Sequence, residues 1–152
     1  MRRISKEISL NCKAGRKSDK YNMEKDSIAY NTFEKGGGAM SIEEIGCCGA
    51  YCRTCHALTE SACQGCKLRY STGERDIKKA KCKMKVCCVT KGFISCADCE
   101  SYGNCSIIRE FHNKNGYKYG KYHQAIEYIK ENGYEQFMSI ADKWGNAYGK
   151  YE

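Results

Sequence analysis

Residues 48–66 read CGAYCRTCHALTESACQGC, and the five cysteines in this stretch indicate how the chain folds. Three CxxC pairs recur along the sequence: Cys52 with Cys55, Cys63 with Cys66, and Cys96 with Cys99. A two-residue gap lets one tight turn aim both sulfurs at a single ion, and two such pairs complete a tetrahedral thiolate site. The spacing therefore predicts an irregular, zinc-knuckle type of segment that is stabilised by metal.

Ten regularly spaced cysteines are the candidate metal ligands: Cys48, Cys52, Cys55, Cys63, Cys66, Cys82, Cys87, Cys96, Cys99 and Cys105. One grouping places the first five around one ion and the last five around a second, and the spacing equally allows an interleaved arrangement. A third site would need His56 or another group. Cys12, Cys47 and Cys88 are left over. We interpret Cys47 and Cys88, each next to a candidate ligand, as spare thiols, with redox-active thiols or substitute ligands as the alternatives.

The chain has too few aliphatic residues for an ordinary hydrophobic core. Leu, Ile, Val and Phe make up 21 of its 152 residues, and the formal net charge is +8. Such a composition does not bury enough apolar surface to offset the ordering entropy of a folded chain. A structural zinc site releases on the order of 10 kcal/mol on assembly, which is comparable with the stability of a whole domain. Bound metal would therefore supply the missing cohesion.

The cysteines also indicate a reducing compartment. The N-terminal stretch lacks the hydrophobic region and cleavage site of a secretory signal, and 13 cysteines cannot all be paired in disulfides. We expect a cytoplasmic protein with no membrane span. Two tetrathiolate zinc sites would lower the net charge from +8 to about +4. With this charge, the excess of basic over acidic residues is no longer a specific sign of nucleic-acid binding.

Zinc and iron–sulfur clusters both accept tetrahedral sulfur ligands. The bacterial cluster motif CxxCxxCxxxCP is absent, and the chain contains no proline. The CxxxCxxC spacing of Cys48, Cys52 and Cys55 matches that of radical-SAM clusters, but the chain is too short for that family's barrel. We favour zinc, with an iron–sulfur cluster as the alternative.

Three segments differ in composition. Residues 1–39 are polar and end in three glycines, which predicts a disordered arm. Lys35-Gly36-Gly37 resembles a translated ribosome-binding site, so Met40 is an alternative natural start. Residues 40–110 form the cysteine-rich metal-binding segment, and residues 111–152 form a helical segment packed on it.

Helical periodicity is confined mainly to the C-terminal part. We expect helices over residues 105–112, 119–131 and 134–144, each followed by a glycine suited to a helix C-terminus. Apolar stripes on the last two predict a C-terminal helical hairpin; they comprise Tyr122, Ala125, Ile126 and Ile129, then Phe137, Ile140, Ala141 and Trp144. Ser71 and Glu74 have capping-box spacing and predict a short helix through Lys81. The fold class is thus small, metal-stabilised and mainly α.

Several motifs together resemble a known family. They are CGAYCRTC at 48–55, CQGC at 63–66, CKMKVC at 82–87, CADCESYGNC at 96–105, IIREFH at 107–112 and AIEYIKENGYEQFM at 125–138. This set resembles the cysteine-rich prokaryotic family called domain of unknown function 3795, over about residues 45–140. The family typically has a proline before its last cysteine, where this chain has Asn104, so Cys105 is the least secure ligand. The resemblance implies a metal-binding module of bacteria and archaea without an established activity.

The sequence favours a zinc-binding structural or interaction module that recognises a macromolecule. A basic stretch offers a contact surface for nucleic acid or protein: Arg75, Lys78, Lys79, Lys81, Lys83 and Lys85. Tyr117, Tyr119 and Tyr122 could stack on bases, although we favour a packing role for these rings and a solvated face for the lysines.

An iron–sulfur redox protein and a zinc-dependent enzyme of unknown reaction are the alternatives. The chain has no GxSxG, phosphate-loop, HExxH or zinc-deaminase motif, so no catalytic residue is assigned. His56 beside Cys55 is a candidate second-shell group, and His112 and His123 flank a helix junction where they could complete an open metal site.

Overall fold

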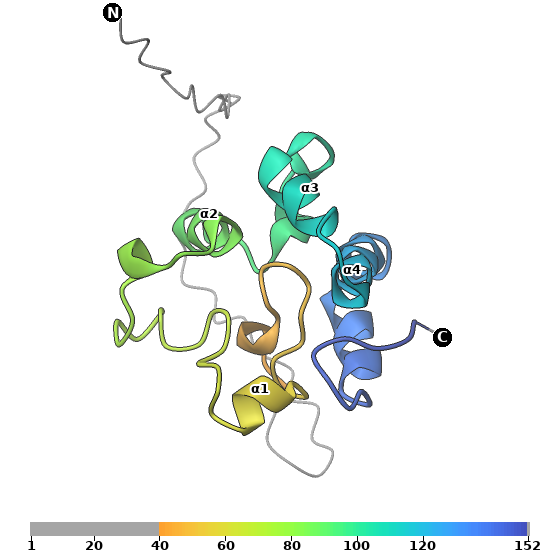
Figure 1. Ribbon diagram of the computed structural model, residues 1–152, viewed down its shortest axis with the longest axis horizontal. Coiled ribbons are helices and arrows are strands. Elements are labelled where there is room, and N and C mark those ends of the chain that lie inside the picture. The colour runs from red at the N-terminus through yellow and green to blue at the C-terminus, as the bar shows by residue number, and fades with distance from the viewer. Residues whose placement is uncertain (1–39, 152) are drawn as a thin grey trace, which may run out of the picture. The chain divides into compact units, whose positions relative to one another are not determined.

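The structure is a computed structural model that describes residues 40–151, which belong to one compact unit (Figure 1). The predicted N-terminal arm, residues 1–39, and the leftover Cys12 lie outside the described residues. Within residues 40–151 the regular structure is helical, with no strand and one isolated bridge between Ile45 and Tyr51. The mainly α fold class is therefore confirmed for this part of the chain.

Residues 40–151 contain four α-helices and four 3-10 turns. The helices are α1 (His56–Thr59), α2 (Lys83–Lys91), α3 (Ser106–His112) and α4 (Tyr117–Ala141). The 3-10 turns are η1 (Ile42–Glu44), η2 (Ile77–Lys79), η3 (Cys96–Asp98) and η4 (Tyr102–Asn104). α3 contacts both α2 and α4, and η3 also contacts α4 (Figure 1).

The C-terminal helices largely follow the sequence prediction. α3 matches the first predicted helix, and α4 contains the other two as halves that meet at Gly133, whose φ of 82° and ψ of 172° are not helical. Two helices therefore meet at Gly133 without an intervening loop, at the break that the sequence predicts between them. Ala125, Ile126 and Ile129 are buried in the first half, and Phe137 and Ala141 in the second.

The predicted helix from Ser71 to Lys81 is wrong. The chain there forms turns and the single 3-10 turn η2, whose first residues are capped by Asp76. The Asp76 carboxylate accepts a 2.9 Å hydrogen bond from the backbone N–H of Lys78. This local bond competes with helix formation at the position where the predicted helix would run.

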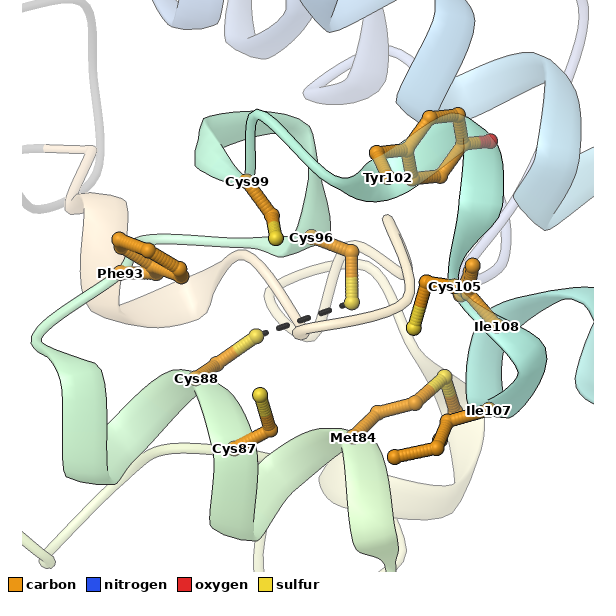
Figure 2. A pocket seen from close by; sticks show the side chains of 10 residues that line it. All are labelled: Met84, Cys87, Cys88, Phe93, Cys96, Cys99, Tyr102, Cys105, Ile107 and Ile108. Atoms are coloured by element: carbon orange, nitrogen blue, oxygen red, sulfur yellow. Dashed lines mark hydrogen bonds between the residues drawn. The ribbon is translucent and has the colours of Figure 1, made fainter. Parts of the chain in front are cut away.

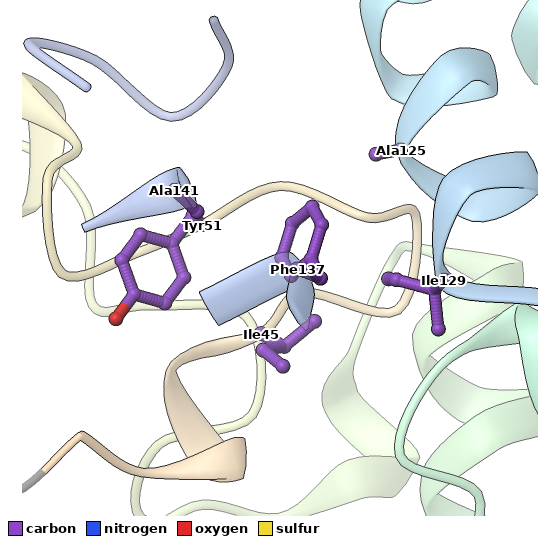
Figure 3. Close-up of a cluster of buried hydrophobic side chains, with 6 residues drawn as sticks. All are labelled: Ile45, Tyr51, Ala125, Ile129, Phe137 and Ala141. Carbon is purple, nitrogen blue, oxygen red and sulfur yellow. The ribbon is translucent and has the colours of Figure 1, made fainter. Parts of the chain in front are cut away.

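Two hydrophobic clusters hold the described residues together. The first packs Ile45 and Tyr51 against buried residues of α4, with Phe137 meeting Tyr51 edge to face at 6.2 Å (Figure 3). The second mixes apolar side chains with cysteines: Cys47, Met84, Cys88, Tyr102, Ile108 and Ile126. Apolar packing thus reaches the cysteine segment only along the side that faces α3 and α4.

Gly49 permits this packing. Its φ is +90°, and a Cβ atom at this position would lie 2.6 Å from the Cβ of Ala125. Only glycine combines the positive φ with such a close approach of the backbone to a helix. Gly49 therefore docks the cysteine segment on α4.

Candidate metal centre

Much of the cysteine segment lacks an apolar interior. In residues 53–83 only Gly65 and Lys67 are buried. The twelve described cysteines, at positions 47–105, are all free thiols. Neither a buried apolar core nor a disulfide stabilises residues 53–83, so other interactions must stabilise them.

The first two CxxC pairs lie together and form the group called here the knuckle: Cys52, Cys55, Cys63 and Cys66. Burial, together with the like charges of Cys66, Cys55 and Cys63, raises the pKa of the Cys52 thiol to about 11, against a hydrogen bond with the Cys66 backbone that lowers it. Helix α1 connects the two pairs, and the Cys63 backbone N–H closes the connection by donating to the Ala57 carbonyl at 2.7 Å. The spacing of the two CxxC pairs is consistent with this arrangement.

The second CxxC turn is fixed by glycine and by an arginine. Gly65 has a φ of +79°, and a Cβ there would lie 2.7 Å from Leu68 Cδ1. Arg75 Nη1 donates to the carbonyl oxygens of Gly65 and Leu68, at 3.0 Å each. Arg75 is therefore committed to the knuckle, and its guanidinium also lies 4.3 Å from the centre of the Tyr70 ring.

A small cavity lies among the remaining cysteines (Figure 2). Its volume is about 30 Å³, and five of its ten lining residues are cysteines: Cys87, Cys88, Cys96, Cys99 and Cys105. Met84, Phe93, Tyr102, Ile107 and Ile108 complete the lining. We call the five cysteines the cavity group. Figure 2 shows the sulfurs of Cys87 and Cys88 on α2 pointing toward those of Cys96 and Cys105 across the cavity.

The cavity presents several sulfur donors to one space. The Cys88 and Cys96 sulfurs lie 3.7 Å apart, and two thiolates at 2.3 Å from one tetrahedral zinc ion lie about 3.8 Å apart. Two unbound sulfurs in contact can also lie 3.7 Å apart, so this distance alone does not indicate a metal. The main support for a metal site is the cavity lined by five thiols.

The side chains are not yet closed around an ion. Within residues 40–151 no group of three or more His, Cys, Asp or Glu side chains is placed as metal ligands require. A metal site formed by either group would therefore require these side chains to move.

Three cysteines lie between the knuckle and the cavity group. Burial raises the pKa of Cys48 to about 12, and Cys66 and Cys82 add to this as neighbouring like charges. Cys82 thus neighbours Cys48 and does not line the cavity, unlike the grouping that placed it with the last five cysteines. Cys47 donates its backbone N–H to Cys66 Sγ at 3.4 Å and accepts from the Cys96 N–H at 2.9 Å, so it links the two groups.

Cys88 and Lys67 are site residues that the sequence did not reveal. Cys88 had been left over, yet it is 1% exposed and lines the cavity. Lys67 is 6% exposed, and Nζ donates to the carbonyl oxygens of Ile42 and Ile94 at 2.8 Å each. Burial lowers the Lys67 pKa, and Glu43, Cys47, Cys66 and Cys88 oppose that shift as negative neighbours. The Lys67 ammonium lowers the pKa of the Cys47 thiol, although a hydrogen bond with Cys88 and burial keep that pKa raised to about 12.

The three histidines have different surroundings. His56 is exposed at the start of α1. His112 and His123 stack on each other, with ring centres 4.4 Å apart. Burial lowers the pKa of His112 to about 4, and the neighbouring His123 adds to the shift while Glu127 opposes it.

Comparisons with known proteins do not identify the chain. No family model, no curated protein and no solved structure matches it. The resemblance to domain of unknown function 3795 therefore stays a prediction. Among the described residues, no helix is both long enough and apolar enough to cross a membrane.

Proposed function

We propose that residues 46–105 bind zinc through the knuckle and the cavity group, and that the protein is a zinc-stabilised interaction module. The observation that carries the proposal is the cavity of about 30 Å³ with five cysteines in its lining. Sites with four thiolate ligands are typical of structural zinc, because no position is left open for water or substrate. A structural role is therefore favoured over that of a zinc-dependent enzyme.

Zinc is favoured over an iron–sulfur cluster because the bacterial cluster motif CxxCxxCxxxCP is absent from the chain. An iron–sulfur redox protein remains the alternative, and its colour distinguishes it.

Elemental analysis of the full chain, purified under reducing conditions, tests the metal. We expect a colourless protein with about two zinc ions per chain. Replacing zinc by Co²⁺ should give the intense charge-transfer absorption of cobalt thiolates. Brown protein with iron and sulfide would contradict the zinc assignment, and protein free of bound metal would contradict the whole proposal.

A basic surface on η2 and the start of α2 is the proposed site of macromolecular recognition. Lys78, Lys79, Lys81 and Lys83 are exposed, and within residues 40–151 none of them forms an ion pair. Asp76, which caps η2, is the only acidic residue between Arg75 and Lys85, so the stretch keeps a strong positive charge. We propose that the four lysines contact nucleic-acid phosphates, which would make binding strongly salt-dependent.

Fluorescence anisotropy with a labelled single-stranded oligonucleotide tests this partner. The expected affinity falls steeply as salt rises from 50 mM to 200 mM, following the roughly linear dependence of log affinity on log salt. Changing the four lysines to glutamine should abolish binding, whereas Lys143→Gln, at another exposed lysine, should leave it nearly unchanged. Absence of binding at low salt would exclude nucleic acid.

A further inference from the structure

A second cluster of candidate ligands lies where α3 meets α4, and it contains no cysteine. His112, near the C-terminal end of α3, stacks on His123 of α4 with an interplanar angle of 22°. One turn further along α4, Glu127 Oε1 lies 3.6 Å from His123 Nε2. Two imidazoles and a carboxylate thus meet at this helix junction.

One buried polar atom in this cluster, His112 Nε2, has no hydrogen-bond partner among the described residues. Tyr102 lies beside it: the residue is 8% exposed, its ring centre is 6.3 Å from that of His112, and burial together with the nearby Glu127 carboxylate raises the pKa of its hydroxyl. Buried polar groups are nearly always satisfied, so the unpartnered His112 nitrogen points to an ion or another polar ligand that binds there.

The spacing of the two α4 ligands suits a metal ion. Two ligands at about 2.1 Å from one tetrahedral ion lie about 3.4 Å apart, and His123 Nε2 lies 3.6 Å from Glu127 Oε1. The side chains of His123 and Glu127 are 54% and 45% exposed, so both can adjust by rotation. His112, Tyr102 and the α3 backbone would form the fixed wall of the site.

We propose that His112, His123 and Glu127 bind a divalent transition-metal ion through nitrogen and oxygen, separately from the thiols. As the side chains stand, no three of them are closed around an ion, so rotation of His123 and Glu127 toward His112 Nε2 would complete the site. Imidazole and carboxylate ligands suit Zn²⁺, Co²⁺ and Ni²⁺. Three protein ligands leave a coordination position open for water.

A negative and a positive side chain both lie near the cluster. Glu127 supplies the negative charge, and Lys130 lies over the Tyr102 ring at 4.5 Å from its centre. Tyr102 also lines the sulfur cavity, so the two sites share this ring as a wall. The nitrogen and oxygen site is nevertheless distinct in ligand chemistry, which makes it separable by spectroscopy.

Cobalt titration of zinc-loaded full-length protein tests the proposal. One further equivalent of Co²⁺ should bind with weak d–d absorption and without thiolate charge transfer. The chain has three histidines, and the paramagnetic ion should broaden the imidazole signals of His112 and His123 while those of His56 remain sharp.

Variants supply the matched control. Glu127→Gln and His112→Gln should weaken Co²⁺ binding at least tenfold, whereas Glu131→Gln, at an exposed position on the next turn of α4, should not. Cobalt that enters only with thiolate charge transfer, or that binds equally to Glu127→Gln, would overturn the proposal. Zinc content distinguishes this proposal from the proposed function: cobalt bound by nitrogen and oxygen leaves the zinc content unchanged, whereas cobalt bound by thiolates displaces zinc.

Discussion

Lys67 Nζ donates a 2.8 Å hydrogen bond to the carbonyl oxygen of Ile94 and so ties the knuckle to the loop that follows α2. A second bond of the same length reaches the Ile42 carbonyl. The ammonium is buried, and the nearby thiols of Cys47, Cys66 and Cys88 offset its desolvation when they are ionised. One side chain therefore couples the backbone of three segments to the charge of the sulfur groups.

Lys67→Met should destabilise the zinc-loaded protein by about 2–4 kcal/mol, because two buried carbonyls lose a charged donor. It should also weaken zinc binding, since a cation beside the thiolates disappears. Urea denaturation and competition with a chelator measure the two effects. Lys78→Met, at an exposed lysine, should change stability by less than about 0.5 kcal/mol. Equal behaviour of the two variants would contradict the role of Lys67.

Gly65→Ala should disrupt the knuckle. Its Cβ would come within 2.7 Å of Leu68, and the residue would keep a φ of +79° between Cys63 and Cys66. Gly73→Ala is the matched control, because its φ is +77° but no atom lies within 4 Å of the added Cβ. Both variants carry the cost of a positive φ, on the order of 1 kcal/mol, and only Gly65→Ala should lose zinc affinity. Similar affinity in both would show that the turn is not a ligand support.

Phe137→Ala should separate the apolar cluster from the metal centre. Phe137 is 0% exposed and contacts Tyr51, so its truncation should cost about 3–5 kcal/mol. The zinc content should stay unchanged, since no sulfur of the knuckle or the cavity group belongs to this cluster. Calorimetry and elemental analysis together check both statements. Loss of zinc at temperatures where the variant is still folded would contradict the separation.

Protonation of His112 should weaken the fold in acid. Its folded pKa of about 4 lies below the ordinary value of 6.5, so the unfolded chain binds more protons between these values. Stability is therefore retained above pH 6.5 and falls as the pH is lowered toward 4. Melting curves of His112→Gln should have a shallower pH dependence than those of the parent protein in this window. Identical slopes would show that His112 does not contribute.

The sequence predicted the elements whose signals are local. α3 and both halves of α4 follow from apolar periodicity that ends at Gly133 and other glycines. α2 was missed because its buried residues are Met84 and Cys88, and Cys88 was interpreted as a spare thiol. The predicted helix at 71–81 failed because Asp76 caps a shorter turn.

Other features depend on contacts between distant segments. The sequence around Lys67 gives no sign that this side chain is buried. Its ammonium gains hydrogen-bond partners only because Ile42 and Ile94 approach it in the fold. Cys88 likewise enters the site because the chain returns to it at Cys96. Arg75 was assigned to a binding surface and instead holds the Gly65 turn. No local pattern indicates which segment will pack against these side chains.

Hydrogen exchange before and after complete removal of metal by chelator, under reducing conditions, tests the central claim that thiolate-bound zinc holds the cysteine segment. If zinc stabilises this segment, amides in residues 46–105 should lose their protection from exchange when zinc is removed. They should regain it when one zinc ion is returned for the knuckle and one for the cavity group. Unchanged protection and an unchanged melting temperature in the metal-free protein would contradict this claim.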